Sequence, residues 1–249
     1  MTFTDKVNYR RLRDHDPIHQ VFCDKLRMRD YVTERLGPGS VPRLLAVGEH
    51  AAEFREMKGP FVLKPSHGSA MVNVLTESRT LTSEERDQAD AWLTRDFAWG
   101  GIEWAYLGAR RALLVEELLL PAHGVAAFTE YRFMAFHGKT EMIYVDITED
   151  GSRYRLLRYP DWSPMEGTLL HPNPPNRNQP PPPHLDLMLE WAEVLGRDID
   201  FVRVDFYELE DRILVGELTP YPSNASVRFR PASLDVWLGS KWLSVPPKR

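Results

Sequence analysis

The stretch that most constrains the fold is residues 201–222, which read FVRVDFYELEDRILVGELTPYP. Two apolar-rich runs, residues 201–207 and 213–219, flank a turn-forming Glu-Leu-Glu-Asp-Arg segment, and this pattern is typical of a β-hairpin. Successive side chains of a strand face opposite ways. We therefore expect Arg203 and Asp205 to share one face of the first strand.

The second strand of this hairpin adds another carboxylate. Glu217 and Thr219 share one of its faces, so pairing around the turn would place Glu217 beside Asp205 with no cation between them. A hard divalent ion such as Mg²⁺ is the natural partner, because it is usually held by one or two carboxylates together with substrate phosphates. An ordinary half-exposed hairpin with acids placed by chance is equally compatible with this stretch alone.

Composition limits the protein classes to consider. A chain of 249 residues with 43% hydrophobic residues can bury one substantial core or two smaller ones. Its net charge of −5 argues against a general nucleic-acid binder, which would normally show a basic face. Cys23 is the single cysteine, so an intramolecular disulfide is impossible and a cytoplasmic location is expected. No run approaches the ~20 apolar residues needed to span a bilayer, and no apolar leader follows Met1.

The first half of the chain places two lysines beside backbone that suits an anion. Asp24 is expected to cap the helix that follows it, and Lys25 lies in the first turn of that helix. A strand at residues 61–65 contains Lys64 and leads into a loop of mostly small residues, which returns to an apolar run at 72–75. The loop residues are Ser66, His67, Gly68, Ser69 and Ala70. Their backbone N–H groups could close over a phosphate, although the Walker order of Gly and Lys is absent.

Periodicity and turn signals divide the rest of the chain into further strands and helices. Strands are expected at residues 41–47, 111–119, 129–136 and 140–147, and helices at 24–36, 49–57, 82–97 and 185–195. The strand at 111–119 contains Glu116 and Glu117, which need donors such as ribose hydroxyls or lysine if they are buried. Arg132 and Asp146 are charged residues among the apolar neighbours of the hairpin at 129–147.

Two further groups of residues have alternative interpretations. Residues 172–183 hold seven prolines and should form an extended connector, which we interpret as an internal surface strap rather than a ligand for a proline-binding partner domain. Five arginines could supply a cationic rim for an anionic substrate, although most such arginines are solvated surface residues. They are Arg153, Arg155, Arg158, Arg228 and Arg230.

The order of these motifs, from the lysine helix to the Arg-x-Asp hairpin, resembles the ATP-grasp superfamily over about residues 24–222. This is the fold of D-alanine–D-alanine ligase and related carboxylate–amine ligases. Five motifs further resemble the teichuronopeptide-biosynthesis (TupA-like) branch nearly from end to end. They are DKVNYR at 5–10, KPSHGSA at 64–70, EYRF at 130–133, FVRVD at 201–205 and GELT at 216–219. Proteins of this branch are associated with bacterial cell-surface polymers and natural-product clusters.

The resemblance implies an α+β fold in which two α+β subdomains clasp ATP. We expect an N-terminal arm at residues 1–23, a small subdomain with the flap loop at 24–118, and a large subdomain with the metal-binding hairpin at 119–249. The pre-ATP-grasp domain, which usually helps to bind the carboxylate substrate, is expected to be reduced or absent. The acceptor site is therefore the part of the family pattern that transfers least to this chain.

The resemblance also implies roles for the nucleotide-binding residues. Lys25 and Lys64 would hold the ATP phosphates, while the loop at 66–70 closes over them. The residues that would line adenine and ribose are Glu116, Glu117, Leu118 and Leu119. The acid at 116 or 117 would take the ribose hydroxyls.

Roles in catalysis and metal binding follow from the same resemblance. Asp205 and Glu217 would bind Mg²⁺, and Arg203 would steady the transferred phosphoryl group and the tetrahedral intermediate. Arg132 would contact phosphate or substrate. The superfamily usually has an asparagine metal ligand where this chain has Thr219, which is a weaker ligand and decides whether one Mg²⁺ or two are held firmly.

Three functions are compatible with this pattern. The first is an ADP-forming ligase that joins a carboxylate to an amine through an acyl phosphate, in cell-surface polymer or natural-product biosynthesis. The second is a phosphotransferase that passes phosphate to a hydroxyl. The third is a non-catalytic ATP-binding partner protein, which the presence of both lysines, both acids and Arg203 disfavours. The identities of the substrates and the oligomeric state stay open.

Overall fold

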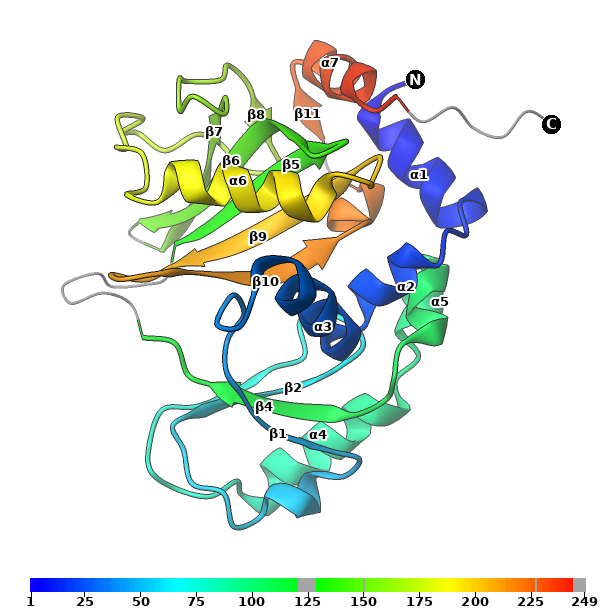
Figure 1. The fold of residues 1–249 in the computed structure, drawn as a ribbon, viewed down its shortest axis with the longest axis vertical. Helices are drawn as coiled ribbons and strands as arrows, with labels where there is room; N and C mark the ends of the chain where they lie inside the picture. The colour runs from blue at the N-terminus through cyan, green and yellow to red at the C-terminus, as the bar shows by residue number, and fades with distance from the viewer. Residues whose placement is uncertain (121–128, 150, 227, 244–249) are drawn as a thin grey trace. The chain divides into compact units, whose positions relative to one another are not determined.

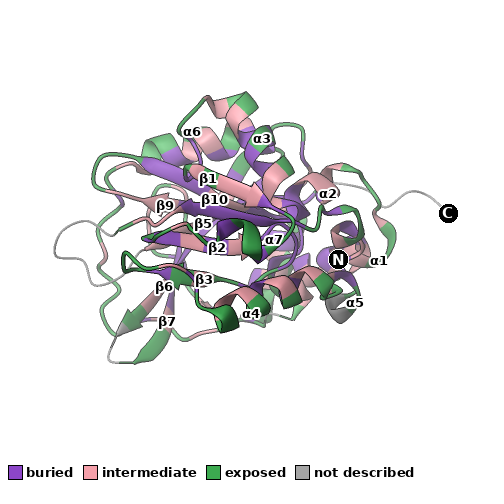
Figure 2. Cartoon of the chain, turned by 90° about the horizontal axis from the view of Figure 1, so that it is seen from below, coloured by how far each residue is buried: buried purple, intermediate pink, exposed green. Residues whose placement is uncertain are grey.

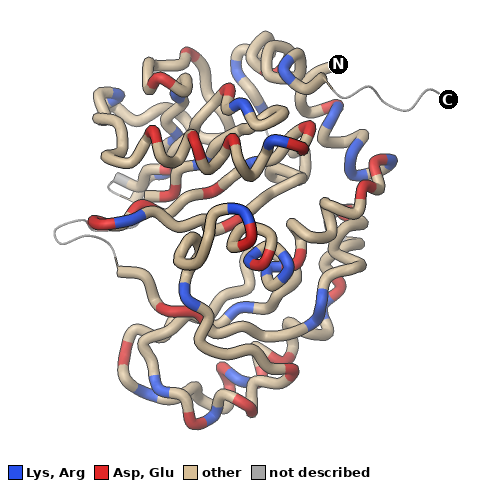
Figure 3. The backbone as a smooth tube through the Cα atoms, viewed as in Figure 1, with Lys and Arg blue, Asp and Glu red and all other residues tan. Residues whose placement is uncertain are grey.

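The computed structural model describes residues 1–120, 129–149, 151–226 and 228–243 (Figure 1). Contacts between Cα atoms divide the chain into unit 1, residues 1–14 and 121–249, and unit 2, residues 15–120. The division expected from the sequence, at 1–23, 24–118 and 119–249, stays a prediction. Acidic and basic residues are interspersed along both units, in keeping with the small net charge of −5 (Figure 3).

Unit 2 is built on a four-stranded antiparallel sheet with strand order β1-β4-β2-β3. Its strands are β1 Leu44–Gly48, β2 Phe61–Pro65, β3 Asn73–Leu75 and β4 Leu113–Glu117. Its helices are α2 Ile18–Cys23, α3 Lys25–Leu36, α4 Ser83–Thr94 and α5 Phe97–Gly101, with 3-10 turns η1 Ala51–Phe54 and η2 Trp104–Gly108. The predicted strand at 61–65 is confirmed, whereas the predicted helix at 49–57 shortens to the single turn η1.

The helix starts predicted at residues 24 and 82 are confirmed by their capping hydrogen bonds. Asp24 accepts hydrogen bonds from the backbone N–H groups of Leu26 at 3.0 Å and Arg27 at 3.3 Å. Its other carboxylate oxygen accepts from the backbone of Arg110 at 2.9 Å, which ties the start of α3 to the segment that enters β4. Thr82 and Glu85 form a capping box at the start of α4.

Strand alternation in unit 2 separates a buried face from a polar one. Phe61 and Leu63 on β2 and Val115 on β4 are fully buried, in a cluster that includes Trp92 of α4. Most of helix α4 is intermediate or exposed, as Figure 2 shows. Residues one position along each strand must face the opposite way. The side chains of Lys64 and Glu116 therefore lie together on the other face of this sheet.

Unit 1 is built on a five-stranded antiparallel sheet of described residues with strand order β10-β9-β5-β6-β7. Its strands are β5 Glu130–Phe136, β6 Lys139–Glu149, β7 Ser152–Arg158, β9 Val202–Glu208 and β10 Ile213–Thr219, with a small sheet of β8 Thr168–Leu169 and β11 Phe229–Arg230. Its helices are α1 Phe3–Arg13, α6 Leu185–Gly196 and α7 Ala232–Lys241, with the 3-10 turn η3 Pro222–Ala225. Both predicted hairpins and the predicted helix at 185–195 are confirmed.

The two faces of this larger sheet are covered differently. On one face, α6 packs across β5, β6 and β9 and buries Met188 (Figure 1). On the other face, Met134, Tyr144 and Phe201 join a core cluster with residues of α1 and α7. This cluster covers only one end of that face. Beyond it, the same strands carry polar side chains.

Residues 1–23, expected to be a polar arm, contain the helices α1 and α2. Phe3 stacks edge-on against Phe201 at a centroid distance of 4.9 Å and lies in the core cluster of unit 1. Arg10 is fully buried, donates to the carbonyl oxygen of Phe201 at 2.8 Å and lies over the ring of Trp242. Helix α1 therefore packs into the core of unit 1.

The proline-rich segment 172–183 lies on unit 1 as an extended strap. The carbonyl oxygen of Pro172 accepts a hydrogen bond from the backbone of Arg155 at 2.8 Å, and that of Gln179 accepts one from the indole of Trp162 at 2.9 Å. These contacts favour the predicted internal strap.

Among the described residues, no helix combines the length and the apolar character that crossing a membrane would require.

Candidate nucleotide and metal site

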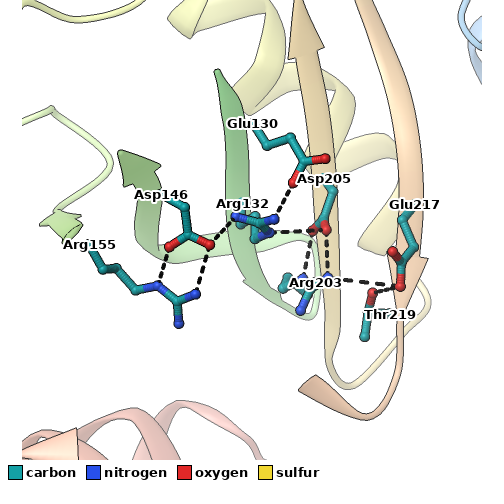
Figure 4. Close-up of polar contacts among 8 residues, drawn as sticks. All are labelled: Glu130, Arg132, Asp146, Arg155, Arg203, Asp205, Glu217 and Thr219. Atoms are coloured by element: carbon teal, nitrogen blue, oxygen red, sulfur yellow. Dashed lines mark hydrogen bonds and ion pairs between the residues drawn. The ribbon is translucent and has the colours of Figure 1, made fainter. Parts of the chain in front are cut away.

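A row of polar residues crosses the sheet of unit 1 (Figure 4). Glu217 pairs with Asp205 in the register of β10 and β9, and Asp205 pairs with Arg132 in the register of β9 and β5. The register of β9 and β10 shifts between Val215 and Glu217, which marks a bulge at Gly216. The adjacency of the two carboxylates, expected from the hairpin, is therefore present.

The expectation that no cation separates these carboxylates was wrong. The guanidinium of Arg203 donates from Nε to Asp205 Oδ1 at 2.6 Å and from Nη2 to Oδ2 at 2.5 Å, and Nη2 lies 3.8 Å from Glu217 Oε1. Arg132 Nε approaches Asp205 Oδ2 at 3.4 Å. The repulsion between the two carboxylates is reduced because arginine side chains on the same sheet face neutralise their charge.

The burial of this cluster shifts the pKa values of its members. Desolvation, with a contribution from Glu217, raises the pKa of Asp205 to about 6 in spite of Arg203 and Arg132. Burial alone would lower the pKa of Arg203, but Asp205, Tyr144 and Glu217 raise it well above its ordinary value. Arg203 is therefore a permanent cation at the centre of the cluster.

Glu217 and Thr219 form the more open side of the cluster. Thr219 Oγ1 donates to Glu217 Oε1 at 2.6 Å, which confirms that the two side chains share a strand face. The Glu217 side chain is 46% exposed, whereas that of Asp205 is 8% exposed. Glu217 is therefore the carboxylate of this pair that an incoming ion would reach first.

The donors of this cluster fit a hard cation such as Mg²⁺. A carboxylate offers about four lone-pair positions, and Arg203 uses two of those on Asp205. Within the described residues, no group of three or more His, Cys, Asp and Glu side chains forms a complete metal cage. An oxygen-only set of Asp205, Glu217 and Thr219 suits an ion that takes its remaining ligands from phosphates and water.

A second charged cluster lies within unit 2. Lys64 Nζ is 2.6 Å from Glu116 Oε2, and Arg29 Nη1 is 2.7 Å from Glu116 Oε1. Arg29 also donates to the carbonyl oxygen of Pro42 at 2.5 Å. Glu116 is thus a buried anion paired with two cations. Lys64 is the lysine donor that a buried acid in this strand was expected to need.

The predicted flap loop is attached to the start of α3. The backbone N–H of Lys25 donates to the carbonyl oxygen of Ser66 at 2.8 Å, and Lys25 Nζ donates to that of Gly68 at 2.5 Å. Gly68 has a φ of +80°, a conformation that favours glycine. Lys25 and the loop are therefore brought together, as the phosphate-binding prediction requires.

Much of this loop is buried rather than exposed. Ser66 and His67 are 0% and 2% exposed, and only Ser69 and Ala70 are classed as exposed. His67 Nε2 lies 3.1 Å from the carbonyl oxygen of Trp92. Desolvation, with smaller effects of Arg111 and Lys25, lowers the pKa of His67, so the imidazole is neutral at neutral pH.

The adenine-side residues lie at the end of β4. Glu117 accepts a hydrogen bond from the backbone N–H of Arg43 at 2.8 Å and is half-buried, as are Leu118 and Leu119, which follow the strand. Of Glu116 and Glu117, Glu116 has the more fully paired carboxylate, because both of its oxygens contact cations. The assignment of all four residues to adenine and ribose stays a prediction.

Several charged residues of these clusters were missed or misinterpreted from the sequence. Arg29 was missed, although it lies one helical turn after Lys25 on the same face of α3, and this spacing could have indicated that the two cations lie close together. Most of the five arginines of the predicted rim were interpreted as solvated, but Arg155 and Arg158 are 5% and 3% exposed. Arg155 pairs with Asp146 through Nε at 2.5 Å and Nη2 at 2.8 Å (Figure 4).

A comparison with protein families gives a match over most of the chain. The family model described as TupA-like ATPgrasp matches residues 5–243. No curated protein matches the chain as a relative.

Solved structures with a similar fold are ATP-grasp ligases. An L-amino acid ligase from Bacillus licheniformis superposes with a TM-score of 0.50 at 13% identity and covers 83% of this chain and 44% of its own. The D-alanine–D-alanine ligase of Helicobacter pylori gives a TM-score of 0.48 at 14% identity, with 91% and 60% covered, and that of Bacillus anthracis 0.45 at 15%, with 80% and 57% covered. The chain thus spans less than two thirds of the length of these ligases. The likeness to the L-amino acid ligase is one of fold alone, and it is in keeping with the family match.

Proposed function

Because this chain belongs to the TupA-like ATP-grasp family, we propose that it is an ATP- and Mg²⁺-dependent carboxylate–amine ligase. The observation that carries the proposal is the register that sets Asp205 beside Glu217 with Arg203 on the same face. The role would lie in bacterial cell-surface polymer or natural-product biosynthesis, in the cytoplasm, where the buried thiol of Cys23 stays reduced.

Each unit contributes a different group of contacts in this proposal. Lys25 and Lys64 of unit 2 bind the phosphates as point charges, and the exposed backbone at Ser69 and Ala70 adds N–H donors. The half-buried carboxylate of Glu117, rather than Glu116, takes the ribose hydroxyls. Because Lys64 is already held by Glu116, its ammonium is positioned before nucleotide binds.

Residues of unit 1 act at the reacting phosphoryl group. Mg²⁺ held by Asp205 and Glu217, with Thr219 as a weak ligand, would neutralise the charge of the phosphates. A substrate carboxylate oxygen bonds to the terminal phosphorus as ADP leaves. The amine nitrogen then bonds to the carbonyl carbon and loses a proton, while the C–O bond to phosphate breaks and phosphate departs. Arg203 stabilises the charge that develops in both steps, and Arg132 supports Asp205 from the neighbouring strand.

Substitution of the two carboxylates tests the metal assignment. We expect Asp205→Ala and Glu217→Ala each to lower ADP formation, measured with paired acid and amine substrates, by at least about 100-fold. Glu210→Ala is the matched control, because Glu210 is an exposed acid in the turn of the same hairpin. Wild-type ADP formation by either site variant would overturn the assignment.

Product analysis tests the reaction type. An amide formed together with ADP and phosphate supports the ligase. A phosphoester formed with ADP would identify a phosphotransferase to a hydroxyl instead. Nucleotide binding by calorimetry without ADP release, for any acid and amine pair, would identify a non-catalytic ATP-binding protein.

A further inference from the structure

A polar hollow of about 260 Å³ opens on unit 1 at the β5, β6 and β7 side of the sheet. Its lining residues are Glu130, Asp146, Ile147, Thr148, Arg153 and His171. None of these residues belongs to the predicted nucleotide or metal contacts. The hollow is slightly smaller than typical small-molecule sites, which begin at about 300 Å³, so it suits a small metabolite.

Strand order places opposite charges on opposite sides of this hollow. Glu130 and Asp146 belong to the inner strands β5 and β6, whereas Arg153 belongs to β7, the edge strand of the sheet. The register pairs Thr148 with Arg153, which fixes Arg153 beside β6. His171 is held outside β7, because the adjoining Pro172 accepts a hydrogen bond from the backbone of that strand.

The acids of the hollow retain capacity for a further donor. Glu130 uses Oε2 to accept from Arg132, and its other oxygen makes no hydrogen bond to the described residues. Asp146 accepts three hydrogen bonds, two from Arg155 and one from Arg132, which leaves about one lone-pair position on the carboxylate. The Arg155 and Arg132 guanidiniums hold the pKa of Asp146 below its usual range, against the effect of burial.

Arg153 and His171 supply corresponding spare donors on the other side of the hollow. Arg153 is exposed and makes no ion pair within the part of the chain that the structure describes. The imidazole of His171 likewise makes no hydrogen bond to the described residues. A cavity whose walls carry unused acceptors on one side and unused donors on the other matches a dipolar ligand.

We propose that this hollow binds the amine substrate as a zwitterion, namely a small α-amino acid. Its ammonium group contacts Glu130 and Asp146, and its carboxylate contacts Arg153 and His171. The assignment rests on the proposed ligase function, in which the amine must face the phosphoryl-transfer residues.

The orientation agrees with the contacts of Arg132, which joins the hollow to the metal cluster. Its guanidinium donates to Asp146 at 2.7 Å and to Glu130, and its Nε lies 3.4 Å from Asp205. The ammonium end of the ligand is therefore one side chain away from Asp205. The carboxylate end lies toward the sheet edge, away from the reacting atoms.

The test is calorimetric titration of the full chain, without nucleotide, with each of the proteinogenic amino acids and D-alanine. Each amino acid that binds is then compared with its N-acetyl derivative, which lacks the ammonium, and its amide, which lacks the carboxylate. We expect both derivatives to bind at least about tenfold more weakly, because each leaves a charged partner unpaired. Absence of binding by every amino acid, or equal binding of the derivatives, would overturn the proposal.

Two variants assign the two ends of the ligand. Arg153→Gln should reduce the preference for the amino acid over its amide, and Glu130→Gln should reduce the preference over the N-acetyl derivative, with the remainder due to His171 and Asp146. Glu130→Gln keeps a side-chain oxygen for Arg132, so the cluster stays intact. Arg197→Gln, at an exposed arginine after α6, is the matched control and should retain both preferences. Unchanged preferences in the two hollow variants would contradict the assignment.

Failure of this proposal is distinguishable from failure of the ligase function. Amino-acid binding with the expected preferences, but no ADP release, would leave the hollow as a binding site and exclude the ligase. ADP release that proceeds equally well with amines that lack a carboxylate would support the ligase and overturn the zwitterion site.

Discussion

Arg203 and Asp205 lie two residues apart on β9 and are joined by two parallel hydrogen bonds of 2.6 and 2.5 Å. Both side chains are at least 90% buried, and Arg132 and Glu217 are their nearest other charged neighbours. A buried pair of this geometry gains from its hydrogen bonds but also loses the hydration of both ions. Its removal therefore has different effects when one partner or both are replaced.

We predict that Asp205→Ala destabilises the protein by about 3 kcal/mol, because it leaves the buried Arg203 cation with only the distant carboxylate of Glu217. Replacing both residues by apolar ones, Arg203→Met with Asp205→Leu, should cost less than the single change. Urea denaturation followed by tryptophan fluorescence measures both. A double variant less stable than Asp205→Ala would contradict this account.

The shared anion of unit 2 gives a second prediction. Glu116→Gln should lower the free energy of unfolding by about 3 kcal/mol, because Arg29 and Lys64 would both lose a buried charged partner. Weaker binding of MgATP is expected as well, since Lys64 would lose its fixed position. Glu117→Gln is the control for stability, because Glu117 is only half-buried. Equal losses of stability in the two variants would show that the buried contacts of Glu116 with Arg29 and Lys64 add nothing to the free energy of unfolding.

The secondary structure was predictable where strand alternation or helix periodicity was carried by apolar residues. The β5–β6 and β9–β10 hairpins and helix α6 are of this kind. Helix α1 was missed because Arg10, one of its three buried residues, reads as a surface residue. Strand β7 was missed for the same reason, since the buried Arg155 and Arg158 interrupt its apolar pattern.

The site was predictable only for residues on the same strand or on strands joined by a short turn. The adjacency of Asp205 and Glu217 follows from the hairpin alone. The Arg29–Glu116 pair spans 87 residues, and no local pattern indicates such a contact. The position of the Arg203 guanidinium depends on its rotamer, which strand alternation does not specify.

The turn between β5 and β6 gives a third prediction. Gly138 has a φ of +81°, and a Cβ there would lie 3.0 Å from the carbonyl oxygen of Glu193 and 3.1 Å from Arg197 Cα. Gly138→Ala should cost about 1 kcal/mol for the left-handed backbone and at least about 1 kcal/mol more for crowding against α6. Gly151→Ala is the control, because Gly151 has a φ of +75° with open space around it. Equal thermal stabilities of the two variants would contradict the crowding argument.

The start of α4 gives a prediction of pH dependence. Hydrogen bonds from Arg79, at 2.7 Å to each oxygen, lower the pKa of Glu85 from 4.5 to about 2. The stabilisation is therefore fully present above pH 4.5 and is lost as the pH falls toward 2. Because Arg79 is partly exposed, Glu85→Gln should cost only about 0.5–1 kcal/mol near neutral pH.

Glutamine retains the capping acceptor, so the difference between Glu85→Gln and the wild type isolates the ion pair. Chemical denaturation at a series of pH values should show this difference shrinking on acidification. A difference that is constant from neutral pH to below pH 4.5 would exclude the ion pair as its cause.

The packing of α1 into unit 1 has a consequence for the order in which the chain folds during synthesis. Unit 2, residues 15–120, is continuous and can fold as soon as it has left the ribosome. Unit 1 needs Trp242, which packs against Phe3. Trp242 is made 122 residues after Leu120, the last residue of unit 2, which takes about 6–24 s at about 5–20 residues per second. Until then the apolar side chains of α1 lack their partners in the core cluster of unit 1, and a chaperone bound to this helix would protect it from aggregation.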